Sequence, residues 1–385
     1  MRIAYVTETF PPEVNGVALT TSRTVDLLRQ AGHHVQVLRP RQAGEAACDD
    51  EREWRTPGSP LPLYPGLQFG WATPRAVRQR LAGAEVGLVH LATPGPLAWA
   101  ALRAAGAMGL PATSDFRTNF HQYAGHYGLR RCGPWLLRGL RAFHNRCGCT
   151  FVPTRQTREE LAHRGFDRLA VLGRGVDTAL FHPGRRDAAL RAAWGADERT
   201  PLLLHVGRLA AEKNVALALQ SFEDLRATGS PARMVVVGDG PLRAPLARAH
   251  PTVRFVGMLS GTALAAAYAS ADLFVFPSVT ETFGNVTLEA LASGLAVVAF
   301  RTGAAAEHIR HGLNGILAAA GDDAGFRRAV CRHAPHCVEL RALRDEAART
   351  ARALAWERVN ARFERRLHQV VEDYASSGGG RRRAA

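Results

Sequence analysis

Short apolar segments alternate with helical segments along the chain, and this alternation occurs twice. Apolar runs without polar alternation are typical of strands that are buried on both faces of a parallel sheet. The predicted strands are 2–7, 34–38, 86–91, 112–116 and 150–152 in the first series, and 202–207, 234–237, 253–256, 273–276 and 296–300 in the second. The sequence therefore predicts an α/β protein with two doubly wound, Rossmann-like domains, which bind ligands in a cleft at the carboxyl ends of their strands.

The 385 residues divide at a stretch that is rich in glycine and proline. We expect an N-terminal domain over 1–180, a linker over 181–200 and a C-terminal domain over 201–355. A C-terminal helix is predicted over 356–375. The Gly- and Arg-rich tail 376–385 is expected to be disordered.

Several classes of protein are excluded by patterns that the sequence lacks. No run of about 18 apolar residues is present to span a membrane, and the first apolar segment is too short for a signal peptide. We therefore expect the protein in the cytoplasm. The six cysteines do not make a disulfide scaffold in a chain of this length. Cys147 and Cys149 lie near Cys132 and His144, but the spacing matches no standard metal site, and we interpret these cysteines as reduced thiols.

The formal net charge is +15, and the 49 basic residues include a single lysine, Lys213. We attribute this skew toward arginine to GC-rich codons. Residues 128–146 are more informative, because Trp135, Leu136 and further apolar residues alternate with arginines there. This pattern indicates either a helix that lies on an anionic membrane surface or a core-facing helix with a basic outer face. No nucleic-acid motif is present, so we expect no specific nucleic-acid partner.

Asn15 and Gly16 lie in the turn between the first predicted strand and a helix predicted over 17–31. A glycine at this place lets an anionic group approach the backbone N–H groups and the positive end of the helix. The alternative is an ordinary loop glycine before a helix.

The corresponding turn of the second domain carries two cations, Arg208 and Lys213, between the strand 202–207 and a helix. Two cations beside a helix N-terminus suit a diphosphate. Lysine offers a compact and flexible charge where arginine offers a rigid planar fork. The occurrence of the chain's single lysine in this turn therefore favours a specific role for Lys213. The alternative is a lysine retained by chance.

Two glutamates follow the strand 273–276, with Glu281 expected in the loop and Glu289 in the next helix. Carboxylates are good acceptors for the hydroxyl groups of a sugar. The backbone N–H groups at the start of this helix would face a phosphate; they belong to Phe283, Gly284 and Asn285. The alternative is two ordinary glutamates that favour the helix.

Two further patterns are absent. The chain contains no Asp-x-Asp pair, so the positive charge for a diphosphate is expected from Arg208 and Lys213, with no metal ion and no cofactor. Gly238-Asp239-Gly240 lacks the third glycine of a nicotinamide fingerprint, because Arg243 occupies that position. This difference argues against a dehydrogenase.

Four motifs between residues 174 and 289 occur together and in a fixed order. They are Arg174–Asp177, the turn Gly207–Lys213, the turn Val237–Pro241 and the pair Glu281-x7-Glu289. Together they resemble the family-4 retaining glycosyltransferases of GT-B fold. The opening segment Glu8–Val17 is most similar to that of GDP-mannose-dependent α-mannosyltransferases and sulfoquinovosyl-diacylglycerol synthases, and the resemblance extends to about Tyr374.

The resemblance implies roles for matching positions. Arg208 and Lys213 would hold the donor diphosphate and stabilise charge on the leaving group. Glu281 would bind hydroxyls of the donor sugar, with help from the N–H groups of Phe283 to Asn285, and Glu289 would bind the ribose.

The same resemblance extends to the remaining candidate positions. Gly16, with Asn15 before it, would let the donor phosphate or the acceptor approach the backbone. Gly238 and Asp239 would belong to the substrate-binding turns. The C-terminal helix, from Trp356 to Tyr374, would cross back onto the first domain.

Arg117 marks a departure from the family pattern. Close relatives often have Phe-His-Thr-Asn-Phe after the fourth strand, and this chain has Arg117 in place of that histidine. Arginine cannot act as a general base, although it can pair with a phosphate. His121 is the candidate for part of the histidine's role, and a structural histidine is the alternative.

The sequence as a whole predicts a metal-independent enzyme. We expect retaining transfer of a hexosyl unit, mannosyl first, from a nucleotide sugar such as GDP-mannose to a membrane lipid or glycan. The protein is then expected in the cytoplasm or at the inner face of the membrane. The alternatives are a UDP-sugar-dependent glycolipid synthase of the same family and a non-catalytic, basic protein that binds nucleotides or polyanions.

Overall fold

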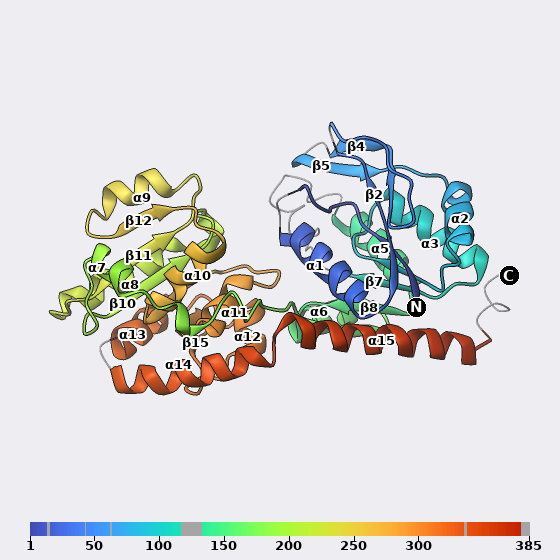
Figure 1. The fold of residues 1–385 in the computed structure, drawn as a ribbon. Coiled ribbons are helices and arrows are strands. Elements are labelled where there is room, and N and C mark those ends of the chain that lie inside the picture. The colour runs from blue at the N-terminus through green and yellow to red at the C-terminus, as the bar shows by residue number, and fades with distance from the viewer. Residues whose placement is uncertain (14–15, 43, 62–63, 117–132, 335–336, 379–385) are drawn as a thin grey trace. The chain divides into compact units, whose positions relative to one another are not determined.

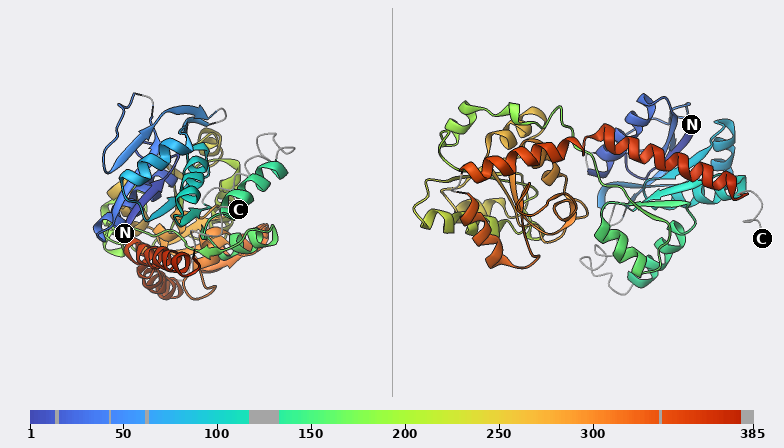
Figure 2. Two further views of the ribbon diagram at one scale, coloured as in Figure 1. Left: turned by 90° about the vertical axis from the view of Figure 1, so that its right-hand side faces the viewer. Right: turned by 90° about the horizontal axis from the view of Figure 1, so that it is seen from below.

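The computed structural model describes residues 1–13, 16–42, 44–61, 64–116, 133–334 and 337–378. The chain forms two compact units, Met1–Leu172 with Asn360–Ala385 and Gly173–Val359. Each unit contains its own parallel sheet with helices on both faces (Figures 1 and 2). The predicted α/β class with two Rossmann-like units is thereby confirmed.

The first unit has a seven-stranded sheet in the order β3-β2-β1-β6-β7-β8-β9, in which all neighbours are parallel. The strands are β1 (Arg2–Val6), β2 (His34–Pro40), β3 (Glu53–Thr56), β6 (Leu88–Leu91), β7 (Ala112–Asp115), β8 (Cys149–Val152) and β9 (Leu169–Val171). The helices are α1 (Gly16–Gln30), α2 (Pro74–Gly83), α3 (Pro96–Met108), α5 (Gly133–His144), α6 (Arg155–His163) and α15 (Trp356–Ser376). An antiparallel hairpin, β4 (Gly58–Leu61) with β5 (Tyr64–Gly70), lies beside this sheet.

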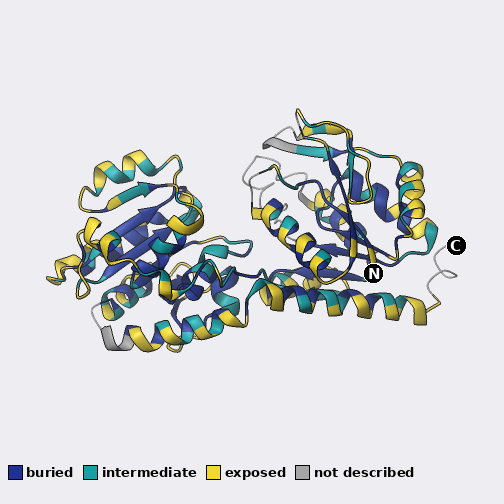
Figure 3. Ribbon diagram, in the orientation of Figure 1, coloured by how far each residue is buried: buried dark blue, intermediate teal, exposed yellow. Residues whose placement is uncertain are grey.

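Successive side chains of β1 point to opposite faces of this sheet, as the pleat of a strand requires. Ala4 and Val6 pack in a cluster with α2 and α3, whereas Ile3 and Tyr5 pack with α1 and α15. Both faces are therefore covered, and the inner strands β2, β1, β6, β7 and β8 are buried along nearly their whole length, whereas the edge strands β3 and β9 are mostly half-buried (Figure 3). This double burial explains the continuous apolar runs in the sequence.

The second unit has a six-stranded parallel sheet in the order β12-β11-β10-β13-β14-β15. The strands are β10 (Leu202–Val206), β11 (Arg233–Val237), β12 (Arg254–Gly257), β13 (Leu273–Phe276), β14 (Ala296–Phe300) and β15 (Ile316–Ala318). The helices are η1 (Pro183–Arg185), α7 (Ala188–Ala193), η2 (Ala211–Lys213), α8 (Val215–Ala227), α9 (Arg243–Ala249), α10 (Gly261–Ser270), α11 (Asn285–Ala292), α12 (Gly303–His308), α13 (Asp323–His333) and α14 (Cys337–Arg352). Residues of α10, α11 and α14 form the core on one face, and residues of α8 and α13 form the core on the other.

The expected linker over 181–200 is wrong, because this segment is part of the second unit. Phe181 and Trp194 are buried in its hydrophobic core. The guanidinium of Arg191 is also buried, and it donates to the Asp272 carboxylate at 3.0 Å. Glycine and proline in this stretch form turns around α7 and do not make a free connection.

The predicted C-terminal helix corresponds to α15. From Asn360 onward it belongs to the first unit, where Phe363 and Leu367 pack in one cluster with Ile3 and Tyr5. Figure 2 shows this red helix running along the first unit. Of the predicted tail, residues 379–385 lie outside the described part of the chain, so its disorder stays a prediction. None of the described helices is long and apolar enough to cross a membrane.

Candidate active site

Three loops lie at the carboxyl ends of β11, β10 and β13, which are neighbours in the sheet of the second unit. The loops are 238–242, 207–214 and 277–284, and they contain most of the residues selected from the sequence. The chain runs from β10 to β11 on one side and reaches β13 on the other, so the strand order reverses beside β10. Doubly wound sheets bind their ligands at this reversal.

Gly238 allows the loops after β10 and β11 to touch. Its φ is +132°, and a Cβ at this position would lie 1.9 Å from the carbonyl oxygen of Gly207. The Leu209 N–H donates to the Asp239 carbonyl at 2.9 Å. The position therefore requires glycine. The Asp239 carboxylate pairs with Arg243 at 3.0 Å, on an exposed side of the turn.

Lys213 and Glu281 form an ion pair that joins the loops after β10 and β13. The distance between Nζ and Oε1 is 2.5 Å, and the two side chains are only 19% and 10% exposed. The Ser278 hydroxyl donates to the same Oε1 at 2.8 Å, and the Val279 N–H donates to the Glu212 carbonyl at 3.2 Å. Partial burial reduces the screening that weakens surface pairs. The loops thus hold a cation and a carboxylate in direct contact.

Arg208 begins the same loop as Lys213 and is exposed. The described residues offer no partner to its guanidinium. The chain then forms η2 and passes through Asn214, whose φ is +48°, before α8 starts. This short loop therefore presents one guanidinium to solvent and one ammonium at the strand ends, which suits a polyvalent anion.

The start of α11 lies in the same loop as Glu281. Gly284, with a φ of +92°, is the N-cap of this helix, and no side chain caps it. The Thr287 N–H donates to the Gly284 carbonyl at 3.1 Å, so the N–H groups of Asn285 and Val286 are the ones left without a partner inside the helix, at the positive end of its dipole. The Phe283 ring is buried and anchors the loop, while Asn285 Oδ1 accepts from Arg174 at 3.4 Å.

Glu289 lies farther along α11, and its carboxylate faces α10. The Tyr268 hydroxyl donates to Glu289 Oε2 at 3.0 Å. Burial raises the pKa of Glu289 to about 7, and the hydrogen bond from Tyr268 acts in the opposite direction. Burial and the nearby carboxylate also raise the pKa of Tyr268 well above its ordinary value, so this tyrosine stays protonated and donates. The hydrogen bond from Tyr268 thereby orients the carboxyl group of Glu289, and the pKa of this group lies near neutral pH.

The candidate residues of the first unit are only partly described. Gly16 is the exposed first residue of α1, at the carboxyl end of β1. Its carbonyl accepts from the Thr20 hydroxyl at 2.7 Å. Asn15, Arg117 and His121 lie outside the described residues, so their roles stay predictions.

Glu8 is a buried carboxyl group of the first unit to which the sequence analysis assigns no role of its own. Its carboxylate accepts from the Gly70 N–H at 2.5 Å and from the Leu97 N–H at 3.1 Å, at the start of α3. Burial raises its pKa to about 7, against the lowering effect of these hydrogen bonds. Glu8 thus ties the end of β1 to the hairpin and to α3.

Ser278 and Tyr268 were also missed by sequence reasoning. Ser278 gives a weak local signal, because it stands three residues before Glu281 in the same loop. Tyr268 gives none, since it lies in the preceding helix and reaches Glu289 only through the packing of α10 on α11.

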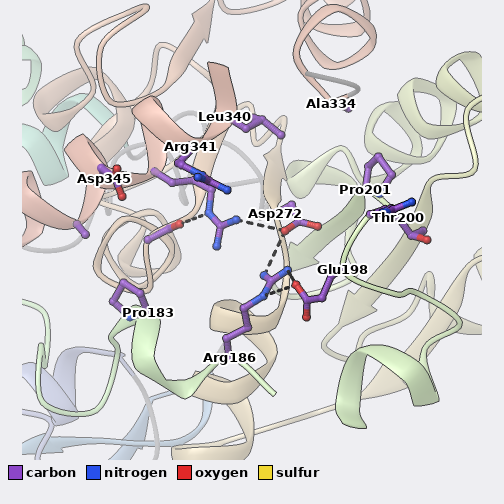
Figure 4. Close-up of a pocket in the computed structure, with 14 residues that line it drawn as sticks. Pro183, Arg186, Glu198, Thr200, Pro201, Asp272, Ala334, Leu340, Arg341 and Asp345 are labelled. Atoms are coloured by element: carbon purple, nitrogen blue, oxygen red, sulfur yellow. Dashed lines mark hydrogen bonds and ion pairs between the residues drawn. The ribbon is translucent and has the colours of Figure 1, made fainter. Parts of the chain in front are cut away.

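The pocket drawn in Figure 4 lies at the amino ends of the strands of the same sheet, opposite the three loops. Asp272 in its lining directly precedes β13. Its carboxylate accepts from Arg186 at 3.2 Å and from Arg344 at 3.3 Å, besides Arg191. These arginines are occupied by an internal ion-pair network. The pocket is therefore separate from the loops that carry Lys213 and Glu281.

A metal site at Cys147 and Cys149 finds no support among the described residues. Both are buried free thiols, and Cys132 lies outside the described part of the chain. The described residues bring three metal-ligating side chains together in the first unit, His33, Glu364 and His368. They bring no such group together at the loops after β10, β11 and β13.

Sequence comparison matches two successive parts of the chain, each lying mostly within one of the two units. Residues 14–180 match the model of a family described as "Glycosyltransferase Family 4", and residues 200–334 match one described as "Glycosyl transferases group 1". A GDP-mannose-dependent alpha-mannosyltransferase of Mycolicibacterium smegmatis is 36% identical over 364 residues, which cover 92% of this chain and 94% of the relative. A GDP-mannose-dependent alpha-(1-6)-phosphatidylinositol dimannoside mannosyltransferase of Mycobacterium tuberculosis is 36% identical over 53% of each chain.

Comparison with solved structures bears on the fold alone. A sucrose-phosphate synthase from Thermosynechococcus elongatus superposes with a TM-score of 0.73 at 18% identity, over 97% of this chain and 99% of that one. This likeness extends through both units and supports the GT-B architecture. From the two family matches, the near full-length relative and the fold, we conclude that the chain belongs to the family-4 glycosyltransferases of GT-B fold.

Proposed function

We propose that this glycosyltransferase moves a mannosyl unit from GDP-mannose to a membrane lipid or glycan acceptor, with retention of configuration. The observation that carries the proposal is the Lys213–Glu281 pair at the strand-order reversal of the second unit. The named activity of the relative that is similar over nearly its full length supports the choice of donor. The named substrate of the mycobacterial relative supports a lipid acceptor.

Lys213 and Arg208 are proposed to bind the donor diphosphate. The Lys213 ammonium is already fixed by Glu281 in a half-buried position, so little reorganisation is needed when negative charge develops on the leaving diphosphate. Arg208, exposed on the same loop, adds a planar fork that suits phosphate oxygens. These two cations take the place of a metal ion in the proposal.

Glu281 is proposed to bind hydroxyls of the donor sugar. Its Oε1 accepts from Lys213 and Ser278, which fixes the carboxylate and leaves Oε2 for a hydroxyl. The N–H groups at the start of α11, with Phe283, Gly284 and Asn285, are proposed to face the phosphate or the sugar. Gly238 and Asp239, in the turn that touches the loop of Lys213, are proposed to line the donor site beside them.

Glu289 is proposed to bind the ribose of the nucleotide. A carboxylate that Tyr268 orients suits two neighbouring hydroxyl groups as donors. On the acceptor side, Asn15, Gly16, Arg117 and His121 keep the roles that the family resemblance implies.

The helix α5 is proposed to lie on an anionic membrane surface at the cytoplasmic face, where a lipid acceptor would be reached. Trp135 and Leu136 are 73% and 40% exposed, and the Arg138 guanidinium stacks 5.6 Å from the Trp135 ring centroid. Farther along the same helix, Leu140 and Phe143 are buried and fix it to the unit. An exposed indole beside arginines is the pattern of an interfacial helix.

A donor panel tests the proposed chemistry. Purified protein is incubated with GDP-mannose, UDP-glucose or ADP-glucose, and release of the nucleoside diphosphate is measured with and without lipid extract. We expect release from GDP-mannose and an α-linked product. Release from a UDP-sugar alone would favour the glycolipid synthase. No release from any donor, together with tight and salt-dependent binding of polyanions, would overturn the proposal.

A vesicle assay tests the membrane surface. The double variant Trp135→Ala/Leu136→Ala should lose sedimentation with anionic vesicles while keeping release of GDP from the soluble donor. Met258 is 74% exposed in the second unit, and Met258→Ala is the matched control that should still sediment. Equal sedimentation of the double variant and the wild-type protein would contradict the role of α5.

A further inference from the structure

Three metal-ligating side chains gather in the first unit, at a place that has no part in the proposed transfer. His33 lies in the turn between α1 and β2, while Glu364 and His368 stand one helical turn apart on α15. Their ligand atoms all lie within 4.8 Å of one another. His33 Nε2 lies 2.9 Å from Glu364 Oε1, and His368 Nε2 lies 4.0 Å from the same oxygen.

We propose that His33, Glu364 and His368 bind a divalent transition-metal ion of the zinc type. Two imidazole nitrogens and one carboxylate oxygen form a donor set that suits Zn²⁺ and is poor for Mg²⁺ or Ca²⁺, which prefer oxygen ligands alone. Tetrahedral bonds of about 2.1 Å place ligand atoms about 3.4 Å apart. The two separations at Glu364 lie on either side of this value, so small side-chain rotations close the site.

The three side chains differ in their burial and in their other partners. The His33 side chain is only 6% exposed, and its Nε2 lies toward Glu364 while its Nδ1 lies 2.9 Å from the Met1 amine. A metal at Nε2 requires the ring proton on Nδ1, so binding is coupled to loss of a proton from this amine, which can accept from Nδ1 only in its neutral form. An acceptor on the second ring nitrogen is the usual way in which proteins orient a metal-binding histidine, and the neutral amine would fill this place. Glu364 and His368 are more open, with side chains 28% and 48% exposed, which gives an ion a path of entry and leaves room for a water ligand.

A simple ion pair explains only part of this arrangement. The contact between His33 and Glu364 needs no metal, and neither does the longer pair between His368 and Glu364, but these pairs do not account for the approach of the two imidazole rings, whose centroids lie 5.8 Å apart. Glu-x3-His spacing directs both side chains to one side of a helix. A shared ion accounts for all three positions.

The ion would fasten α15 to the turn between α1 and β2. This helix is docked by Phe363 and Leu367 on the same face of the sheet, and the metal would add a cross-link between segments far apart in the sequence. The ligands belong to the first unit, whereas Lys213 and Glu281 belong to the second. The expected consequence is greater stability of the first unit, without a part in the transfer reaction.

Metal titration of tag-free protein tests the proposal. Protein freed of metal with a chelator and then freed of the chelator is titrated with Co²⁺, whose visible absorption reports a tetrahedral site, and with Zn²⁺ by calorimetry. We expect one equivalent to bind. At a hundredfold excess over the dissociation constant, Zn²⁺ should raise the melting temperature by about 5 °C or more.

Single substitutions identify the ligands. His368→Gln should fold like the wild-type protein, because its side chain is half exposed. His368→Gln and Glu364→Gln, each made as a single variant, should weaken Zn²⁺ binding at least about tenfold and remove the thermal shift. His34→Gln is the matched control, since His34 is the exposed neighbour of His33 and stands outside the cluster. Unchanged metal affinity in both ligand variants would overturn the proposal, as would an equal loss in His34→Gln or thiolate absorption from bound Co²⁺.

Discussion

Lys213 Nζ donates to Glu281 Oε1 at a distance of 2.5 Å. The two residues are 68 positions apart in the sequence and meet because β10 and β13 are neighbours at the strand-order reversal. The contact fixes a cation beside the carboxylate that is proposed to hold the donor sugar. Ser278 donates to the same oxygen and completes the cluster.

Ser278→Ala should lower kcat/KM about tenfold without loss of the fold, because it removes one hydrogen bond to an ionised carboxylate. We expect the loss chiefly in kcat, since Ser278 positions Glu281 and does not touch the substrate. Ser260→Ala is the matched control, because Ser260 is exposed and makes no capping hydrogen bond in front of α10. Steady-state kinetics that give the two variants equal parameters would exclude a positioning role for Ser278.

Tyr268→Phe should shift the pH dependence of donor binding to higher pH. The hydrogen bond from Tyr268 lowers the pKa of Glu289, which burial raises to about 7. Removal of this bond raises the pKa further, so the ionised carboxylate that accepts ribose hydroxyls forms only at higher pH. The measurement is the donor KM from pH 5.5 to 9.

Glu289→Gln is the reference for that experiment. The glutamine side chain cannot ionise, so the KM for the donor should be high and nearly independent of pH over the same range. A profile of Tyr268→Phe with the midpoint of the wild-type protein would contradict the role given to this pair.

Glu8→Gln should flatten the pH dependence of stability in the first unit. Burial raises the pKa of Glu8 from 4.5 to about 7, so the folded chain binds more protons than the unfolded chain between these pH values. Stability contributed by this group is therefore full at low pH, falls as the pH rises from about 4.5 to 7 and is lost above that range. The decrease is up to about 3 kcal/mol in the wild-type protein.

Urea unfolding of the first unit, followed between pH 4.5 and 8, measures this effect. The wild-type protein should lose stability across the range, and Glu8→Gln should lose less. An identical slope for the two proteins would show that Glu8 is not the titrating group.

EDTA should leave the initial rate of donor turnover unchanged at temperatures well below the melting point. Arg208, Lys213 and the start of α11 are proposed to supply the positive charge at the diphosphate. Loss of an ion from His33, Glu364 and His368 would lower the melting temperature of the first unit without altering this rate. Abolished turnover that Mg²⁺ or Mn²⁺ restores would show that a metal serves the diphosphate.

Much of the fold could be predicted because the controlling signals are local. The apolar runs of β1, β10 and β13 are buried on both faces, and their residues already show this in the sequence. The loops that hold Lys213 and Glu281 each follow a predicted strand, so the sequence already places them at the carboxyl ends where doubly wound sheets bind ligands. Their direct ion pair depends on side-chain packing and could not be foreseen.

Other features depend on contacts that no local pattern reveals. Trp194 places the expected linker in the core of the second unit, although its neighbours are turn-forming residues. The hairpin of β4 and β5 has the glycines and prolines of a loop, such as Gly58 and Pro60. Tyr268 acquires its position only through the packing of α10 on α11.

Calorimetric titration of GDP-mannose into wild-type protein, Lys213→Ala and Arg226→Ala tests the central claim most directly. Arg226 is an exposed cation in the last turn of α8, which follows the loop of Lys213, and serves as the charge-matched control. We expect Lys213→Ala to bind about 10- to 100-fold more weakly than the wild-type protein, because a charge-assisted contact to the diphosphate is lost. Arg226→Ala should bind like the wild-type protein. Equal donor affinity of Lys213→Ala and the wild-type protein would contradict the account.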